Sequence, residues 1–248
     1  MKHNYSEAPR AYACFPKSDG GALMDKVIHY CWFGGNPLTD TAKKSIASWE
    51  KYAPGYEVRQ WNEGNCDYES CKWARDAHAA GMWAFVADYV RFKVLYEYGG
   101  IYMDVGSELI RSIEPLMESV PFTAFEEQSL TATTGLIVAV ESHDPIIGAC
   151  VERYESMDFR NDPDFLSATT VNEVFTAELE KIGFRRVDEE QRFGADIRFQ
   201  KDEGSAVTQK IAICSGRLLP QIQNLAGIFI REGFCMQKQL PTFFIIHI

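Results

Sequence analysis

Residues 27–61 read VIHYCWFGGNPLTDTAKKSIASWEKYAPGYEVRQW, with an apolar run at each end. The first run, VIHYCWF, is followed by Gly-Gly-Asn-Pro, which is typical of a buried strand that ends in a turn. The last run, YEVRQW at 56–61, alternates as a second strand does. Between them, Thr39 or Asp40 can cap a helix over 41–53. We therefore predict a β-α-β unit with parallel strands and a ligand site near their carboxyl ends.

The next segment has the pattern of a helix, a glycine turn and a short strand. Residues 71–98 show apolar side chains at intervals of three and four, with a break near Gly81. Gly99-Gly100 ends this helical pattern, and Ile101-Tyr102-Met103 begins a strand that leads into Asp104. An aspartate in this position is expected to project from the end of the sheet.

The rest of the chain continues the alternation of strands and helices. We predict strands near 122–125 and 135–140, a helix capped by Asp144 with Pro145 first, a helix late in 161–182, short strands in 184–218, and a terminal strand FFIIHI. This order predicts an α/β fold with a mixed central sheet flanked by helices. We expect residues 1–23 to be an N-terminal extension and residues 24–248 to form one domain.

Composition narrows the class of partner. The chain has 25 Lys and Arg against 35 Asp and Glu, which gives a formal net charge of -10 at pH 7. This balance argues against a nucleic acid partner, because no basic stripe is present to neutralise phosphates. An acidic site also repels a diphosphate unless a cation lies between them. A divalent cation is therefore expected with any phosphate-bearing substrate.

The cysteines and the N-terminal stretch bear on location. The seven cysteines are odd in number and scattered, as reduced thiols of a cytoplasmic protein are. Residues 1–23 lack the apolar core of a signal peptide, and no run reaches the length needed to cross a bilayer. We expect a cytoplasmic protein, and peripheral contact with the inner face of the membrane stays open.

Three charged residues are candidates for the chemistry. Asp88 and Arg91 are three apart on the predicted helix and share one face, so they either grip a ligand together or form a structural ion pair. Asp104 follows the predicted strand, where open α/β sheets bind ligands. Its carboxylate either coordinates Mg²⁺ or Mn²⁺, or caps a turn. The combination of the three favours a ligand site.

These segments resemble the bacterial and fungal glycosyltransferases with a DXD sugar-binding motif, the family 32-like group related to initiating mannosyltransferases and capsular polysaccharide transferases. The resemblance covers approximately residues 24–150 in order. The matching residues are 27–34, Trp49, 54–57, Trp61, Asn62, 87–104 and Glu108. Beyond this part it is faint.

The resemblance implies a GT-A fold, a Rossmann-like α/β sandwich, and a nucleoside diphosphate sugar as donor, held through Mn²⁺ or Mg²⁺. It implies that residues 24–150 bind the donor and that 151–248 form the acceptor side. The implied donor contacts are Trp32 stacked on the base, with Asn62, Gly100, Tyr102 and Gly106 nearby. The implied catalytic residues are Asp88, Arg91 and Asp104, and the implied metal ligands are Asp104, Glu108 and His247.

Two aromatic residues of the first strand keep a second interpretation. Trp32 lies at a strand end, where large aromatic side chains usually pack into a core. His29 lies within the strand, and we interpret it as a hydrogen-bonded core histidine rather than a ligand.

One departure from the family pattern affects the metal. The chain reads Asp104-Val105-Gly106, so a glycine stands where the family has its second aspartate. Loss of one carboxylate weakens cation binding unless Glu108 or a backbone oxygen compensates.

We expect a hexosyltransferase that retains anomeric configuration and acts on a glycan or lipid-linked acceptor in surface polysaccharide synthesis. The alternatives are a nucleotide-sugar-binding relative without catalysis, and an α/β protein with another ligand in which Asp88 and Arg91 are structural.

Overall fold

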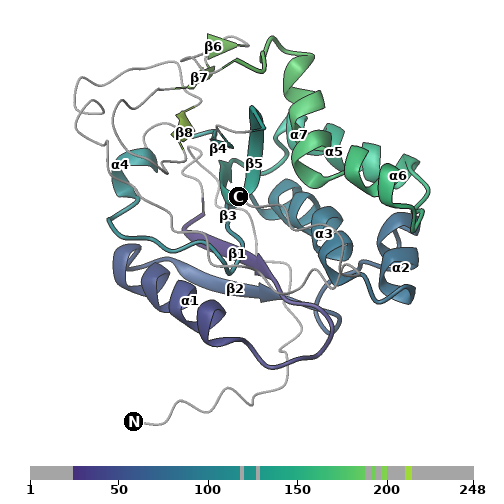
Figure 1. Ribbon diagram of the computed structural model, residues 1–248. Helices are drawn as coiled ribbons and strands as arrows, with labels where there is room; N and C mark the ends of the chain where they lie inside the picture. The colour runs from purple at the N-terminus through teal and green to yellow at the C-terminus, as the bar shows by residue number, and fades with distance from the viewer. Residues whose placement is uncertain are drawn as a thin grey trace.

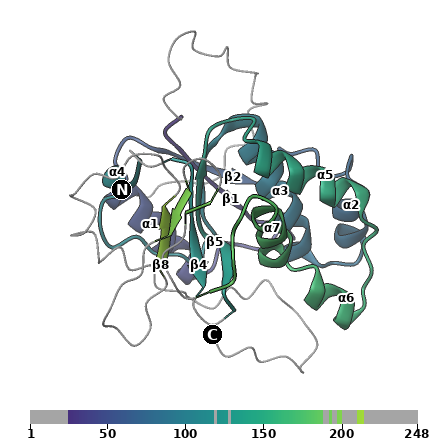
Figure 2. The ribbon, with the colours of Figure 1, turned by 90° about the horizontal axis from the view of Figure 1, so that it is seen from above.

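A central sheet between two layers of helices forms the described part of the chain. The computed structural model describes residues 25–117, 120–126, 129–187, 192–193, 197–199 and 210–213. Seen from above, α1 and α4 cover one face of the sheet, whereas α2, α3 and α5 to α7 lie on the other side (Figure 2). The predicted α/β class, with a mixed sheet flanked by helices, is confirmed.

The elements follow one another as strands and helices along the whole described chain (Figure 1). The strands are β1 (Val27–Cys31), β2 (Glu57–Trp61), β3 (Gly100–Tyr102), β4 (Phe122–Glu126), β5 (Thr131–Val140), β6 (Arg192–Phe193), β7 (Ile197–Phe199) and β8 (Lys210–Ile213). The helices are α1 (Asp40–Tyr52), α2 (Lys72–Ala79), α3 (Trp83–Tyr98), α4 (Glu114–Met117), α5 (Pro145–Ser156), α6 (Pro163–Ala168) and α7 (Val171–Glu180).

The sheet is parallel at one end and antiparallel at the other. Its strand order is β2-β1-β3-β5-β4-β8-β7-β6, and β1 pairs in parallel with both β2 and β3. From β3 onward every neighbouring pair is antiparallel. The predicted β-α-β unit is therefore confirmed, with Thr39 as the residue that caps α1.

Alternate residues of the central strands enter two cores. Ile28, Tyr30 and Ile101 pack into the core under α1 and α4, together with the fully buried Trp49. Cys31 and Tyr102 pack on the opposite face, against α2, α3, α5 and α7. This alternation is the two-residue period of a strand. It places Tyr102, and with it Asp104 two residues later, on the face of the sheet that α3 covers.

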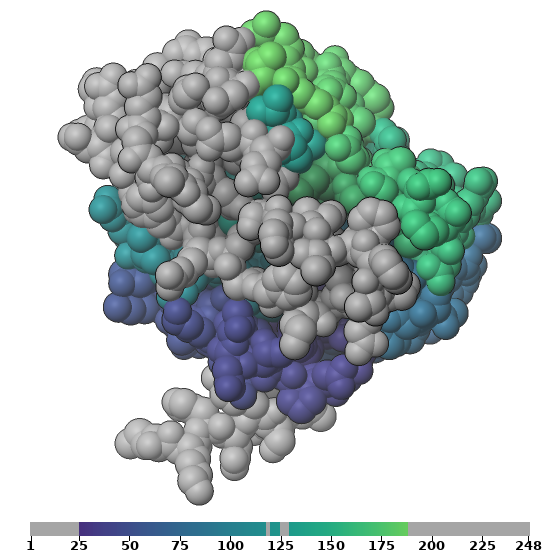
Figure 3. All heavy atoms as spheres, viewed as in Figure 1, coloured from purple at the N-terminus to yellow at the C-terminus, as the bar shows by residue number. Residues whose placement is uncertain are grey.

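Helix α3 is buried on nearly all sides, because it lies between the sheet and the helices α2 and α5. Apart from its last turns, where Lys93 and Glu97 reach solvent, such a helix buries its polar residues, which must find partners inside the protein. Asp88 and Arg91 are two of these buried polar residues. In Figure 3, which has the view of Figure 1, the part with β1 and α1 lies at the bottom and helices α5 to α7 lie at the upper right.

Two predicted regions contain more regular structure than the sequence indicates. Strand β5 begins at Thr131, four residues before the predicted start, because the strand includes a threonine-rich stretch that lacks an apolar run. The helix predicted late in 161–182 is α7, which Thr170 caps, and a second helix, α6, precedes it and ends at Ala168. The predicted strand FFIIHI lies outside the described residues. Within the described residues, no helix is long and apolar enough to span a membrane.

Candidate functional site

A glycine pair connects α3 to β3 and brings the candidate residues together. Gly99 and Gly100 have φ values of 65° and 91°, which L side chains rarely adopt. An ideal Cβ on Gly99 would lie 2.6 Å from the backbone nitrogen of Ser142, and one on Gly100 would lie 2.6 Å from Cγ1 of Val27. The chain therefore reverses in a space that only glycine fits, and β3 runs back beside α3.

The backbone of Asp104 is held against β5. Its N–H donates to the carbonyl oxygen of Gly135 at 2.7 Å, and the Ser107 N–H donates to the carbonyl oxygen of Asp104 at 2.8 Å. The Ser107 hydroxyl donates to the same Gly135 oxygen at 2.9 Å. The loop after β3 is thus fixed at a point where the antiparallel strand β5 extends past the end of β3.

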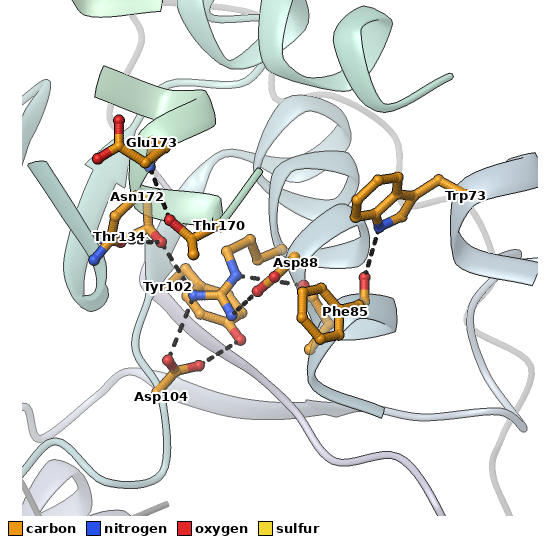
Figure 4. Close-up of polar contacts among 11 residues, drawn as sticks. Trp73, Phe85, Asp88, Tyr102, Asp104, Thr134, Thr170, Asn172 and Glu173 are labelled. Carbon is orange, nitrogen blue, oxygen red and sulfur yellow. Dashed lines mark hydrogen bonds and ion pairs between the residues drawn. The ribbon is translucent and has the colours of Figure 1, made fainter. Parts of the chain in front are cut away.

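The Asp104 side chain belongs to a polar network rather than to a turn cap. The Tyr102 hydroxyl donates to Oδ1 of Asp104 at 2.9 Å, and Nη1 of Arg91 lies 3.4 Å from Oδ2. Nη1 also donates to the Thr134 hydroxyl at 3.1 Å, and Nη2 donates to Oδ1 of Asp88 at 3.0 Å. Figure 4 shows Asp88, Tyr102, Asp104 and Thr134 converging on this point from α3, β3, the loop after it and β5.

Burial separates the members of this network. The side chains of Arg91 and Asp88 are 5% and 10% exposed, whereas that of Asp104 is 37% exposed. Asp104 is therefore the carboxylate through which the network reaches solvent. The guanidinium also lies over the Tyr102 ring, with 4.8 Å from its carbon to the ring centroid.

Two pKa shifts fix the charge state of the network. Burial lowers the pKa of Arg91, but the charges of Asp104 and Asp88 outweigh it, and the net pKa is raised. Burial raises the pKa of Tyr102 well above its usual value. Arg91 therefore stays cationic and Tyr102 stays a hydroxyl donor at physiological pH.

Among the described residues, Asp104 is the member of this network that is suited to bind a cation. Two carboxylates and one guanidinium carry a formal charge of −1, and each oxygen of Asp104 keeps acceptor capacity beyond the hydrogen bond it makes. A hard cation with substrate phosphates as its other ligands suits such a carboxylate. The described residues contain no group of three or more His, Cys, Asp or Glu that could hold a metal on its own.

The other predicted metal ligands are not gathered at Asp104 by any described contact. Glu108 is paired with Lys44, with 2.9 Å between Oε2 and Nζ. His247 lies outside the described residues. The metal-binding roles of Glu108 and His247 stay predictions. Gly106, a predicted donor contact, is buried in the loop between Asp104 and Glu108.

Among the predicted donor-binding residues, Trp32, Asn62 and Tyr102 lie at the carboxyl ends of β1, β2 and β3, whereas Gly100 lies at the amino end of β3. Trp32 is 8% exposed, packs in the core under α1 and donates from Nε1 to the Asn36 carbonyl oxygen at 2.7 Å. This position agrees with the core interpretation, and stacking on a base stays a prediction. Asn62 follows β2, and its Oδ1 accepts from the Gly64 N–H at 2.8 Å.

His29 is the hydrogen-bonded core histidine that the sequence predicts. It is fully buried, its Nε2 lies 3.0 Å from the Gly99 carbonyl oxygen, and its Nδ1 accepts from Nε1 of Trp61 at 3.0 Å. These partners require the neutral ring with hydrogen on Nε2. Burial lowers its pKa to about 3.

Three residues of the network escape the sequence prediction, namely Thr134, Gly135 and Asn172. Thr134 joins Arg91 to α7, because its N–H donates to Oδ1 of Asn172 at 3.2 Å. Asn172 lies in the first turn of α7 (Figure 4). The only sequence signal for them is a strand and a capped helix, and neither pattern shows which residue meets Arg91.

Comparison with protein families gives one match. The family described as "Glycosyltransferase sugar-binding region containing DXD motif" matches residues 39–123, roughly a third of the chain. The matched part contains Asp88, Arg91 and Asp104. The resemblance predicted from these residues is confirmed.

Two solved structures are distant matches. One described as "PaToxG Glycosyltransferase" has 20% identity and a TM-score of 0.48, over 64% of this chain and 68% of that chain. One described as a transferase mutant with two cysteine-to-serine substitutions has 9% identity and a TM-score of 0.41, over 63% of this chain and 85% of that chain. Similarity at this level carries no argument about the site. A search of curated proteins finds no match.

Proposed function

We propose that this protein, a glycosyltransferase by the family match of residues 39–123, transfers a hexose from a nucleoside diphosphate sugar to a glycan or lipid-linked acceptor. The observation that carries the proposal is the Asp104 carboxylate, which is partly exposed while Arg91 and Tyr102 hold it in place. The same proposal includes a GT-A fold, transfer with retention of anomeric configuration and a role in surface polysaccharide synthesis.

The chemistry requires charge control on both sides of the bond that breaks. Cleavage between the anomeric carbon and the phosphate oxygen builds positive charge on the sugar and negative charge on the diphosphate. Asp104 would hold a divalent cation, which would supply positive charge opposite the leaving diphosphate. Asp104 also orients the bound donor, because its carboxylate is held in position before the donor binds.

Arg91 and Asp88 are more deeply buried than Asp104 and hold it in position from inside the protein. The Arg91 guanidinium contacts Asp104, Thr134 and Asp88, and its side chain is 5% exposed. We propose that Arg91 acts by holding Asp104 and that Asp88 keeps the charge on Arg91 balanced. No nucleophile for a covalent intermediate is assigned, and attack from the face of the departing diphosphate needs none.

The finer parts of the proposal concern place and partners. We propose that residues 151–248 form the acceptor side, that the domain spans 24–248, and that the protein acts in the cytoplasm at the inner face of the membrane. An acceptor linked to a lipid would place the reaction at that surface.

Turnover of nucleotide sugars tests the function. UDP- and GDP-hexoses are incubated with the protein and Mn²⁺ or Mg²⁺, and release of UDP or GDP is measured. Asp104→Asn should lower turnover at least about 100-fold, because it removes the charge that the site presents. Asp40→Asn is the matched control, since the Asp40 side chain is fully exposed on α1, and it should leave turnover unchanged. Full activity of Asp104→Asn would reject the assigned site.

The second candidate is a binding protein without catalysis, and Gly106 in place of the second aspartate favours it. Calorimetry with UDP and GDP decides between the two. Tight binding without turnover on any acceptor would favour the binding protein.

A further inference from the structure

We propose that Gly135 is a positioning residue for Asp104, and that the absence of a side chain at this position on β5 is what allows the carboxylate to occupy the site. The proposal rests on the proposed function for its meaning in catalysis. Its structural part can be tested without any substrate.

The space beside Gly135 is filled by Asp104. An ideal Cβ on Gly135 would lie 2.2 Å from Oδ2 and 3.1 Å from Cγ of Asp104. Real Cβ atoms essentially never approach another heavy atom within 3.0 Å. The atom that would collide is the oxygen that accepts from Arg91. Any side chain at 135 therefore competes with the carboxylate for the same place.

A positive φ is not the reason for a glycine here, although the register of β4 against β5 shifts beside it, between Thr123 and Ala124. Gly135 lies inside β5 and, unlike Gly99 or Gly100, has no positive φ. Glycine within a strand loses more conformational entropy on folding than other residues, so it needs a compensating reason such as a close approach. The close approach is that of Asp104, and the glycine serves the carboxylate.

The loop of Asp104 cannot move aside as a whole. The Gly135 carbonyl oxygen accepts from the Asp104 N–H and from the Ser107 hydroxyl, so the loop is tied to the residue that would carry the new side chain. Relief must come from rotation of the Asp104 side chain. That rotation breaks its contacts with Arg91 at 3.4 Å and Tyr102 at 2.9 Å, and turns the carboxylate away from its fixed position.

A double-mutant cycle tests this directly. Wild type, Gly135→Ala, Asp104→Ala and the double variant are compared by thermal unfolding. In the wild-type background, Gly135→Ala should lower Tm by roughly 2–6 °C, because the carboxylate loses its partners. In the Asp104→Ala background the colliding atoms are gone, and the Asp104 Cβ at 3.6 Å is an ordinary contact. The same substitution should then leave Tm unchanged or raise it.

Turnover supplies the second measurement. Gly135→Ala should lower release of UDP or GDP about 100-fold, as far as Asp104→Asn does, because a misplaced carboxylate loses most of its effect. Gly148→Ala is the control, since its Cβ would lie 2.9 Å from Cε2 of Tyr96, away from Asp104. It should keep turnover within about twofold of wild type.

The outcomes separate the two proposals. Equal Tm losses for Gly135→Ala in both backgrounds would overturn the positioning role, as would full turnover of Gly135→Ala in an active enzyme. If wild type turns over no nucleotide sugar, the proposed function fails, and the thermal cycle still decides the role of Gly135.

Discussion

Asp104 combines a fixed position with partial exposure, and Arg91 provides the first of these. Oδ2 of Asp104 and Oδ1 of Asp88 accept from different nitrogens of the same guanidinium. A planar group with five donors can hold two carboxylates and the Thr134 hydroxyl from separate nitrogens, whereas the three donors of a lysine all lie on one nitrogen. Arg91 is therefore the residue on which the geometry of the network depends.

Removal of Arg91 should destabilise the protein strongly. We expect Arg91→Met, which keeps much of the volume, to lower the free energy of unfolding by about 3 kcal/mol or more, because it removes the cation that pairs with the buried Asp88 carboxylate. Arg91→Lys should restore only part of this. Unfolding in urea measures both.

The matched control for Arg91 is an exposed ion pair of the same helix. Lys93 and Glu97 are 33% and 41% exposed, with 3.0 Å between Nζ and Oε1. Lys93→Met should cost less than about 1 kcal/mol. Equal losses for the two variants would mean that burial of Arg91 contributes nothing.

At the scale of elements, the junction of α3 and β3 sets the position of the site. Glycine is needed at Gly99 for two reasons. Its φ is 65°, and a Cβ there would lie 2.6 Å from the backbone nitrogen of Ser142. The turn after the neighbouring strand β1 contains a glycine with only one of these reasons. Gly35 has a φ of 66°, and a Cβ there would meet nothing within 4 Å.

Gly99→Ala should therefore cost more than Gly35→Ala. We expect Gly35→Ala to lower the free energy of unfolding by about 1 kcal/mol, the cost of a positive φ for an L-residue. Gly99→Ala should lower it by roughly 3 kcal/mol or more, because backbone must also move. Chemical unfolding of the two variants measures the difference, and similar losses would show that the space around Gly99 is not restrictive.

The same elements show what the sequence could predict. The α3–β3 junction was predictable because helical spacing, Gly99-Gly100 and Asp104 lie within one short stretch, and local patterns encode it. The start of β5 at Thr131 depends on pairing with the adjacent strand β4, and the contact of Thr134 with Arg91 depends on the packing of segments 43 residues apart. Gly135 carried no local signal either, because its reason is a carboxylate that belongs to another strand's end.

For Trp32 and His29, the sequence left two readings and the structure bears on each. A strand predicts alternation of faces but not how much of each side chain reaches solvent. The core interpretation of His29 is confirmed because both ring nitrogens have partners. The burial of Trp32 agrees with the core interpretation without testing whether a base stacks on it.

On the scale of the whole molecule, His29 couples folding to pH. Its pKa is about 3 in the folded protein against 6.5 as its ordinary value, so between these values the unfolded chain binds a proton that the folded chain does not. Stability should therefore fall as the pH drops below about 6.5, by up to about 1.4 kcal/mol per pH unit. At about pH 5 the loss from this residue reaches about 2 kcal/mol.

Comparison with His29→Gln isolates this contribution. Glutamine can accept from Trp61 and donate to the Gly99 carbonyl, but it does not titrate. Urea unfolding of both proteins at about pH 7.5 and about pH 5 should show that wild type loses about 2 kcal/mol more than the variant. An equal loss in both would mean that His29 does not control the acid limit.

The glycine turn between α3 and β3 also bears on the order in which the site assembles as the chain folds. The contact between Arg91 and Asp104 closes a loop of 13 residues, whereas the contact between Arg91 and Thr134 closes one of 43. Loop-closure entropy makes the longer closure costlier by about 1 kcal/mol. We expect the contact between Arg91 and Asp104 to form early, within one continuous segment, and β5 to pack against this segment afterwards.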